Sequence, residues 1–199
     1  MDNGDCYYEM SDSEIWQTLK EGDRQSLKVL FERYYDDLFG YAYKVSGDTY
    51  LSKDCVQELF YRIWDRKDHL SDVTSVKAYL WVSLRRDIFK AINNDNKEIN
   101  RDDFISYSRL LAFTPEDFMI HEEKQREQKK ALVKALNKLP ERHKEAIYLK
   151  YFNGMGYSEI EKIMSVSYQT ARNYVYHGVK ALKKEFEDKI FTSPKKAAM

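Results

Sequence analysis

The chain has 199 residues, enough for one ordinary domain or two small ones, and its 43% hydrophobic content allows a real core. Three prolines and seven glycines leave few helix breakers, so we expect long helices and an all-α fold. The formal net charge of zero, taken over the whole chain, argues against a nucleic-acid partner, because phosphate binding depends on Lys and Arg.

The start of the chain is acidic and lacks the patterns of an exported or membrane-spanning protein. Residues 1–26 carry 2 positive and 7 negative charges, and we assign 1–22 as an acidic N-terminal segment. No secretory signal is present, and no apolar run approaches the roughly 20 residues that a membrane-spanning helix needs. Cys6 and Cys55 are too few and too far apart for a disulfide framework or a zinc site. We therefore expect a cytoplasmic protein without membrane insertion.

Three helices are expected next, and together they form a first domain over residues 23–93. In each of them apolar residues recur at spacings of three and four, which builds one buried stripe along a helix. The stripes are Leu27, Leu30, Phe31, Tyr34, Tyr35 and Leu38, then Val56, Leu59, Phe60, Ile63 and Trp64, and then Tyr79, Leu80, Ser83, Leu84 and Ile88. The third helix leaves on or near its other side Lys77, Trp81, Arg85 and Lys90.

The helical pattern dissolves after Asn93, where Asn and Asp are frequent, and we assign residues 94–113 as a flexible linker. The run Thr114-Pro115-Glu116-Asp117 is then typical of a helix start, with Thr as N-cap, Pro at the first position and acids in the first turn. We expect a second small helical domain over residues 114–190 and a C-terminal tail over 191–199.

The second domain is predicted to end in a helix-turn-helix motif. Two helices precede it, one through Leu132, Leu136 and Leu139 that stops before Pro140, and one through Ala146, Ile147, Leu149 and Tyr151 that Gly154 and Gly156 cap. Ser158 and Glu161 predict a capping box for the first helix of the motif. The turn is predicted at Ser165-Val166-Ser167, with Ser167 capping a long final helix.

The outward face of that final helix is polar and basic. Its core stripe is Ala171, Tyr174, Val175, Gly178, Leu182 and Phe186, which leaves outside Gln169, Arg172, Asn173, Tyr176, Lys180, Lys183 and Lys184. Residues 165–199 carry 7 positive and 3 negative charges, so the zero net charge hides a basic C-terminal end. Gln, Arg and Asn near a helix N-terminus can bond base edges, and later lysines suit phosphates. We interpret the motif as DNA-binding, and the alternative is a solvated basic face.

Two parts of the sequence resemble the extracytoplasmic-function sigma factors of bacterial RNA polymerase. The stretch LNKLPERHKEAIYLKYFNGMGYSEIEKIMSVSYQTARNYVYHGVKALKK is similar to region 4 of that family, which binds the minus 35 element of a promoter. SKDCVQELFYRIWDRKDHL is similar to region 2.2, and SVKAYLWVSLRRDIFKAIN resembles regions 2.3 and 2.4. The resemblance covers most of the chain in the family's order. It implies a factor that binds core RNA polymerase and directs promoter-specific initiation of transcription.

The resemblance also implies roles for individual residues. Contacts to the minus 35 element fall on Ser167, Tyr168, Gln169, Thr170, Arg172, Asn173, Tyr176 and Lys180. Contacts to the clamp helices of the largest polymerase subunit fall on Asp54, Gln57, Glu58 and Arg62. Contacts to the minus 10 element, where a non-template base leaves the stack, fall on the third helix and the loop before it, with Lys77, Trp81, Arg85 and Arg86. From the residues alone, the row from Asp54 to Arg62 is a solvated face, and Trp81 is equally a core residue.

The same resemblance implies two further partners, the flap of the second polymerase subunit and an anti-sigma factor, which the sequence does not name. Departures from the family are Glu161, where a small residue is common, Ser165, where a turn glycine is common, Arg86 in place of Asn, and Asn93 in place of Arg. They leave the preferred minus 10 bases open.

Other classes of protein have less support. The histidines are scattered without metal-ligand spacing, and no phosphate-binding loop or activated nucleophile is present, so we expect no cofactor, no metal and no enzyme activity. The competing hypothesis is a helix-turn-helix repressor or activator that acts without core polymerase. Residues 54–93 discriminate, because a repressor has no use for this second set of basic and aromatic residues.

Overall fold

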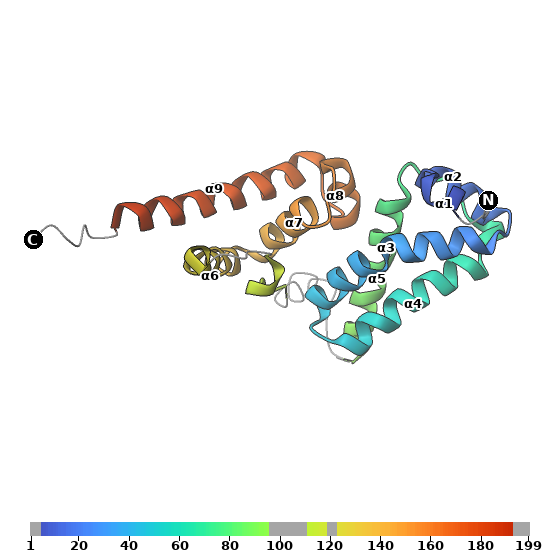
Figure 1. Cartoon of the computed structure of the whole chain (residues 1–199), viewed down its shortest axis with the longest axis horizontal. Coiled ribbons are helices and arrows are strands. Elements are labelled where there is room, and N and C mark those ends of the chain that lie inside the picture. Colours follow the sequence, from blue (N-terminus) through green and yellow to red (C-terminus); the bar gives the residue numbers. More distant parts are fainter. Residues whose placement is uncertain (1–4, 96–110, 119–122, 193–199) are drawn as a thin grey trace, which may run out of the picture. The chain divides into compact units, whose positions relative to one another are not determined.

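The computed structural model describes residues 5–95, 111–118 and 123–192, and every regular element within them is a helix (Figure 1). Apart from Lys162–Ser165, the chain divides between Leu110 and Leu111 into two compact units. We call residues 5–95 the N-terminal unit, and residues 111–118 with 123–192 the C-terminal unit. The all-α prediction is confirmed. The expected linker at 94–113 and tail at 191–199 lie largely outside the described residues.

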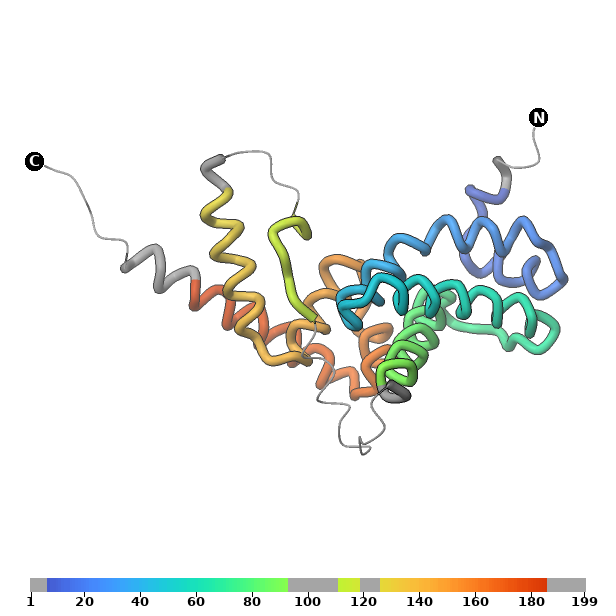
Figure 2. Tube along the Cα trace, turned by 90° about the horizontal axis from the view of Figure 1, so that it is seen from below, coloured from blue at the N-terminus to red at the C-terminus, as the bar shows by residue number. Residues whose placement is uncertain are grey.

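The N-terminal unit is built on the three predicted helices, α3 (Arg24–Ser46), α4 (Thr49–Asp65) and α5 (Val76–Asp95). The first two lie side by side and run in opposite directions, as two views of the molecule show (Figure 1, Figure 2). Their junction is short because Gly47 ends α3 in a left-handed conformation and the Asp48 carboxylate then caps the backbone N–H groups at the start of α4. The core contains the fully buried side chains of Leu30, Leu38, Val56, Leu59, Leu80, Leu84 and Ile88.

Two further helices precede these three, so the prediction of a three-helix domain was incomplete. They are α1 (Asp5–Glu9) and α2 (Asp12–Lys20). The side chains of Ile15, Trp16 and Leu19 on α2 are 0%, 1% and 0% exposed, which makes α2 part of the core rather than an acidic appendage. A capping box between Ser11 and Glu14 starts the helix.

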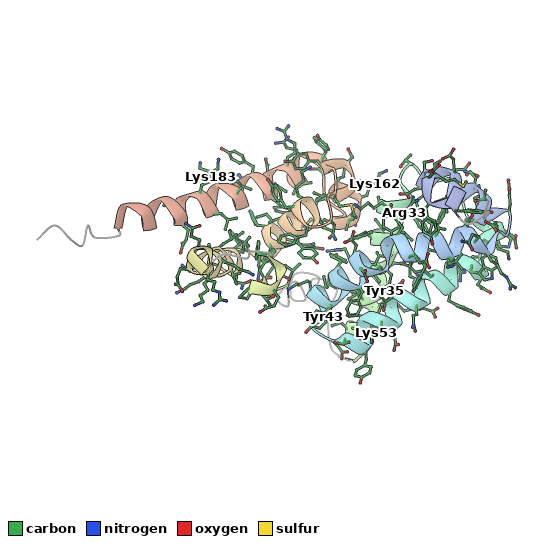
Figure 3. All side chains as sticks on the ribbon, in the orientation of Figure 1. Arg33, Tyr35, Tyr43, Lys53, Lys162 and Lys183 are labelled. Carbon is green, nitrogen blue, oxygen red and sulfur yellow. The ribbon has the colours of Figure 1, made fainter. Side chains whose placement is uncertain are left out.

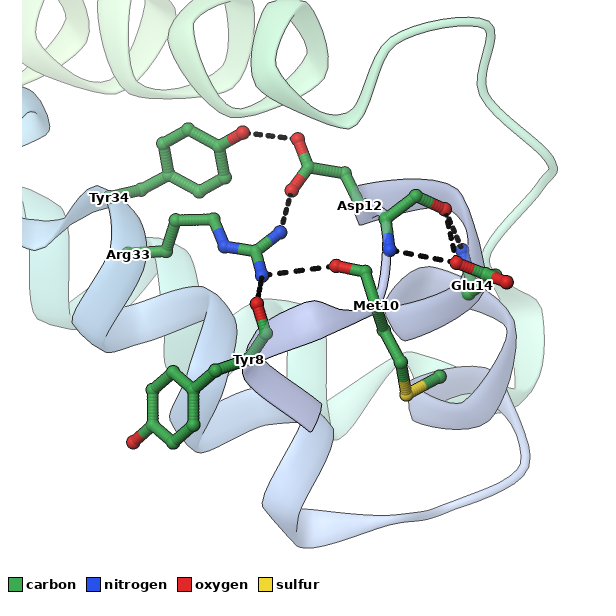
Figure 4. A network of polar contacts seen from close by, with 7 residues as sticks. Tyr8, Met10, Asp12, Glu14, Arg33 and Tyr34 are labelled. Carbon is green, nitrogen blue, oxygen red and sulfur yellow. Dashed lines mark hydrogen bonds and ion pairs between the residues drawn. The ribbon is translucent and has the colours of Figure 1, made fainter. Parts of the chain in front are cut away.

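Arg33 of α3 fastens the start of α2 in place (Figure 4). Its guanidinium donates to the Asp12 carboxylate at 2.5 Å and to the backbone oxygen of Met10 at 3.1 Å. The hydroxyl of Tyr34, also on α3, donates to the same Asp12 carboxylate. Because the ion pair is about one quarter exposed on each side, these charge-assisted hydrogen bonds are partly shielded from water.

Some aromatic residues of the predicted α3 stripe lie at its edge instead of in the core. Phe31 packs against Phe60 of α4 at 5.1 Å between ring centroids, and Tyr35, Phe39 and Tyr43 continue as a stacked row along α3. Tyr35 is half-exposed and Tyr43 is exposed (Figure 3). The predicted placement of Tyr35 in the core was therefore wrong, because α4 covers only the part of this aromatic row near Phe31.

The C-terminal unit consists of a short 3₁₀ turn, η4 (Pro115–Asp117), followed by α6 (Glu123–Asn137), α7 (Glu141–Tyr151), α8 (Tyr157–Met164) and α9 (Tyr168–Thr192). The Thr114 N-cap was predicted correctly, and the element that it starts is a 3₁₀ turn. The Asn137 side-chain amide bonds both backbone groups of Phe113 at 2.8 Å and so ties the incoming segment to α6.

Helices α8 and α9 form the predicted helix-turn-helix motif. The Ser167 hydroxyl accepts a hydrogen bond from the Thr170 backbone N–H at 3.1 Å, as expected for the cap of α9. The predicted capping box from Ser158 to Glu161 was wrong. The backbone oxygen of Gly156 accepts the first helical bonds of α8, and the Glu159 carboxylate bonds the Gly156 N–H at 2.8 Å. Gly156 therefore starts α8. The prediction that Gly154 and Gly156 cap α7 was wrong, because α7 ends at Tyr151 with Phe152 as its C-cap, and Gly154, at φ 64°, lies in the turn that follows.

The turn of the motif holds one residue in a strained conformation. Ser165 lies at φ 53°, in the left-handed region that favours glycine. The N–H groups of Ser165 and Val166 bond the carbonyls of Lys162 and Glu161, a Schellman motif that closes α8. Serine thus occupies the backbone position for which glycine is best suited.

Replacing Ser165 by glycine should stabilise the C-terminal unit by about 1 kcal/mol, because it removes the steric cost of the left-handed conformation. Hydrogen exchange of the α8 and α9 amides reports this change within the full-length chain. Ser158→Gly is the matched control, since Ser158 lies inside α8, where glycine should destabilise by up to roughly 1 kcal/mol. Slower exchange in both variants, or in neither, would contradict the strain at Ser165.

Candidate functional site

The N-terminal unit has a groove between α4 and α5. Its acidic and amide residues Asp54, Gln57 and Glu58 are exposed on α4, as the sequence predicts. The groove is open and has a volume of about 700 Å³. It is lined by Leu51, Asp54, Cys55, Gln57, Glu58, Tyr61, Arg62, Asp87, Lys90 and Ala91. Three of the four predicted polymerase-binding side chains thus face solvent along one side of a shared groove.

The fourth, Arg62, has a different environment. Its guanidinium donates to the carboxylate of Asp87 on α5, and the two side chains are 25% and 16% exposed. A partly buried ion pair of this kind loses much of its contribution if one partner is removed, because the other charge stays behind in a poorly solvated place. Arg62 therefore joins α4 to α5 inside the groove, in addition to lining it.

Cys55 lies in the same groove and its side chain is buried. Burial raises the pKa of its thiol from 9.0 to about 11, and the negative charges of Asp87 and Asp54 act in the same direction. Arg62 opposes them. At neutral pH the thiol is protonated and unreactive, so this cysteine has the properties of a packing residue rather than a nucleophile.

A Cys6→Ser variant should show a thiolate titration of Cys55 with a midpoint near pH 11 by ultraviolet absorbance when folded, returning toward 9.0 in urea. Because the folded state holds this proton more tightly, its stabilising effect is complete below pH 9 and is lost as pH rises toward 11. Asp87→Asn should lower the midpoint in the folded protein. A midpoint near 9 in the folded Cys6→Ser protein would show that the thiol is not buried as described.

The C-terminal unit has a second groove, along the outer face of α9, with a volume of about 610 Å³. It is lined by Tyr151, Tyr157, Gln169, Arg172, Asn173, Val175, Tyr176, Val179, Lys180 and Lys183. Among these described residues there are three cations and no acid, so the groove attracts anions. Five of the eight residues predicted to contact the minus 35 element lie in it, and Lys183 extends it along α9 (Figure 3).

The remaining three predicted residues lie at the start of α9. Ser167 and Thr170 join their hydroxyl groups at 2.8 Å and form the helix cap, while Tyr168 is 44% exposed and contacts the ring of Tyr157. In the same first turn, the side-chain amide of Gln169 donates to the side-chain oxygen of Asn173, one turn further along α9, at 3.0 Å. The two amides are exposed, and their mutual hydrogen bond orients the groups that they present to a ligand.

Two predicted minus 10 residues on α5 do not lie on the surface. Trp81 is fully buried against the ring of Tyr34, and Arg85 is 4% exposed with its guanidinium 4.6 Å from the ring centroid of Phe89. Of the two alternatives left open for Trp81, the structure shows the core position. The expected surface placement of Arg85 was wrong, because α5 is packed by α2, α3 and α4 and keeps only a narrow outer side. Of the other two, Arg86 is exposed and Lys77 is half-exposed above the Trp81 ring.

The outer side of α5 is instead formed by Tyr79, Val82 and Arg86, spaced at i, i+3 and i+7. The predicted core position of Tyr79 was wrong, since its side chain is half-exposed, and Val82, which carried no prediction, is 37% exposed. The spacing itself was visible in the sequence, since it continues from Tyr79 to the exposed Arg86 along one helix side. Apolar residues also lie between these positions, so the sequence pattern did not distinguish this side of α5 from the opposite side, which was predicted to be exposed.

Two features are absent from the described residues. Those residues contain no cluster of His, Cys, Asp and Glu suited to hold a metal ion. Among the described helices, none combines the length and apolar character that would let it cross a bilayer.

Known families match both units in chain order. The model of Sigma-70 region 2 matches residues 30–98, and that of Sigma-70 region 4 matches residues 129–182. The first match contains the α4–α5 groove, and the second contains the α9 groove apart from Lys183. The fold and the two grooves therefore define a sigma factor of the sigma-70 type.

The relatives specify the group. The chain is 22% identical to the ECF RNA polymerase sigma factor SigW of Bacillus subtilis, over 85% of this chain and 94% of the relative. It is 25% identical to the ECF RNA polymerase sigma-E factor of Escherichia coli, over 87% of this chain and 93% of the relative. The protein belongs to the extracytoplasmic-function (ECF) sigma factors.

Solved structures show the same fold. CnrH, solved in complex with the cytosolic domain of CnrY, matches with a TM-score of 0.58 at 16% identity, covering 89% of this chain and 97% of that one. The sigma factor RpoE of Bartonella quintana, solved with the anti-sigma factor NepR, matches with a TM-score of 0.55 at 20% identity, covering 80% and 96%.

Proposed function

We propose that this protein binds core RNA polymerase through its N-terminal unit and directs the enzyme to promoters, without chemistry of its own. The observation that carries the proposal is the presence of region 2 and region 4 in one chain, each with a polar groove of its own. Sigma factors are regulatory DNA-binding proteins. A cytoplasmic location follows from this role, because core polymerase and the chromosome are there.

The exposed row of Asp54, Gln57 and Glu58 is the proposed contact to the clamp helices of the largest polymerase subunit. Carboxylates and an amide on one side of a helix suit a partner that offers cations and hydrogen-bond donors. Arg62 contributes through its ion pair with Asp87, which joins α4 to α5 and so maintains the shape of the groove. The flap of the second polymerase subunit is the proposed partner of the C-terminal unit.

The α9 groove is the proposed contact to the minus 35 duplex. A helix-turn-helix places the N-terminal part of its second helix in the major groove, where Gln, Asn and Arg can bond base edges. Gln169, Arg172 and Asn173 occupy those positions, and Lys180 and Lys183 follow where phosphates would run. The absence of acids among the described lining residues avoids repulsion by the DNA backbone.

The proposed minus 10 contact is the outer side of α5 together with the loop before it. Arg86 and Lys77 supply positive charge near a single strand, and Tyr79 and Val82 supply apolar surface for an unstacked base. Trp81 and Arg85 are buried, so their proposed role is to support this surface from inside the unit rather than to contact DNA directly.

An anti-sigma factor is a further proposed partner. RpoE of Bartonella quintana was solved in complex with the anti-sigma factor NepR, and its fold matches this chain. A repressor or activator that acts without polymerase is the less favoured function, because sigma-70 region 2 has no place in it. Start-site-specific transcripts from purified core enzyme plus this protein support the proposal. Tight binding to a palindrome as a dimer, without association with core enzyme, would exclude it.

Arg172→Ala should reduce promoter-dependent transcription about 5- to 150-fold, as expected for loss of an Arg contact worth roughly 1–3 kcal/mol, while association with core enzyme stays unchanged. The double variant Asp54→Ala, Glu58→Ala should weaken core association and leave the affinity of the isolated protein for minus 35 duplex unchanged. Pull-down with core enzyme measures core association, fluorescence anisotropy measures the affinity for minus 35 duplex, and the amount of transcript made with core enzyme measures promoter-dependent transcription.

Matched controls remove equal charge elsewhere. Lys130→Ala on α6 controls for Arg172, and Asp36→Ala with Asp37→Ala on α3 controls for the acidic pair. If core association and minus 35 binding were weakened equally in both test variants, the proposal that each unit binds a different partner would be wrong.

A further inference from the structure

The helix α2 is bonded to the loop that precedes α5. That loop, residues 70–75, has no regular structure. The indole N–H of Trp16 donates to the backbone oxygen of Ser71 at 3.1 Å, and the Trp16 ring meets the ring of Tyr79, in the first turn of α5, at 5.1 Å between centroids. Trp16 is 1% exposed, so its indole is fixed by the surrounding core when it makes this bond.

A second pair of bonds joins the same helix to the next loop residue. The side-chain amide of Gln17 donates to Asp72 at 2.8 Å, and the ammonium of Lys20 donates to the same carboxylate oxygen at 2.5 Å. The Lys20 hydrogen bond is the largest cause of a lowered pKa of Asp72. Two successive loop residues, Ser71 and Asp72, are therefore held by three side chains from little more than one turn of α2.

The helix that provides these bonds is itself anchored at its other end. Arg33 and Tyr34 of α3 bind Asp12 in the first turn of α2, and Ile15 and Leu19 are fully buried. Core burial and the Asp12 network thus fix α2 against α3, which leaves Trp16, Gln17 and Lys20 at set positions against the loop.

We infer that α2 is a positioning element for promoter recognition, in which Trp16, Gln17 and Lys20 hold loop 70–75 in the conformation that receives the single-stranded minus 10 DNA. The inference rests on the proposed function of the outer side of α5. A loop that is already in its bound conformation loses less entropy on binding, and a competent state populated only in part weakens affinity by that fraction. Lys20 also neutralises the Asp72 carboxylate, which would otherwise repel a nucleic-acid strand.

The test uses full-length protein assembled with cognate core polymerase. A promoter is first selected from genomic fragments by start-site-specific transcription with the wild-type holoenzyme. The probes are the fluorescent non-template minus 10 strand of that promoter and its minus 35 duplex. The variants are Trp16→Phe, which keeps an aromatic ring but removes the indole donor, Lys20→Asp, and the charge exchange Lys20→Asp with Asp72→Lys. Lys28→Asp on α3 is the surface control.

Trp16→Phe and Lys20→Asp should each weaken minus 10 strand binding about three- to tenfold, the effect of losing one hydrogen bond or ion pair that orders the loop. Hydrogen exchange at residues 70–75 should accelerate in both. Minus 35 duplex binding and core association should stay at the wild-type level, and the charge exchange should recover most of the loss. Recovery separates positioning from general destabilisation, which a second substitution would deepen.

Each of the other possible results would refute a specific part of the inference or of the proposed function. Wild-type minus 10 binding by Trp16→Phe and Lys20→Asp holoenzymes would refute the role of α2 and leave the proposed function intact. Equal losses of minus 10 binding, minus 35 binding and core association would show that α2 serves only overall stability. Failure of the wild-type holoenzyme to bind the minus 10 strand would refute the proposed minus 10 surface, and the inference with it.

Discussion

The apolar side of α4 is buried between α3 and α5, and the surfaces of the N-terminal unit depend on this packing. Val56, Leu59 and Ile63 are at most 2% exposed, so α4 cannot rotate without exposing its core side chains. Burying a Val, Leu or Ile side chain contributes about 1.5–3 kcal/mol, which makes this orientation strongly preferred. In this orientation of α4, Asp54 and Glu58 face outward and Arg62 lies next to Asp87. The α4–α5 groove therefore follows from the burial of the apolar side of α4.

The C-terminal unit uses the same constraint with a different result. Ala171 and Val175 bury one side of α9 against its unit, and the other side is left with cations. What the motif adds is a sharply defined turn, because Gly154 and Ser165 both lie in the left-handed region and limit where α8 begins and ends. Backbone conformation thus sets the angle at which α9 leaves the turn, and side-chain chemistry sets what its outer face binds.

Periodicity predicted the long helices because their apolar stripes are long enough to be unambiguous. It failed for α2, a helix of nine residues in an acidic segment, whose three buried side chains are too few to define a period. It failed for Arg85 and left Trp81 undecided because α5 is packed on several sides, so a residue off the main stripe is still buried. The α8 cap was missed because Gly156 and Ser158 both suit an N-cap, and only the hydrogen bonds decide between them. The outer row on α4 and the basic side of α9 were predictable because each is continuous over several helical turns.

The distribution of charge explains how a chain with no net charge can serve two different partners. Residues 165–199 carry 7 positive and 3 negative charges, whereas residues 1–26 carry 2 and 7, so duplex DNA attracts one end of the chain and repels the other. A single basic surface spread over both units would let DNA compete for the face proposed to bind polymerase. The ion pair of Lys20 with Asp72 fits this arrangement, because a lysine of the acidic segment cancels a negative charge in the loop 70–75, which is proposed to lie beside single-stranded DNA. Charge therefore directs each unit to its own partner, while the local bonds of α2 allow an acidic helix to support a nucleic-acid surface.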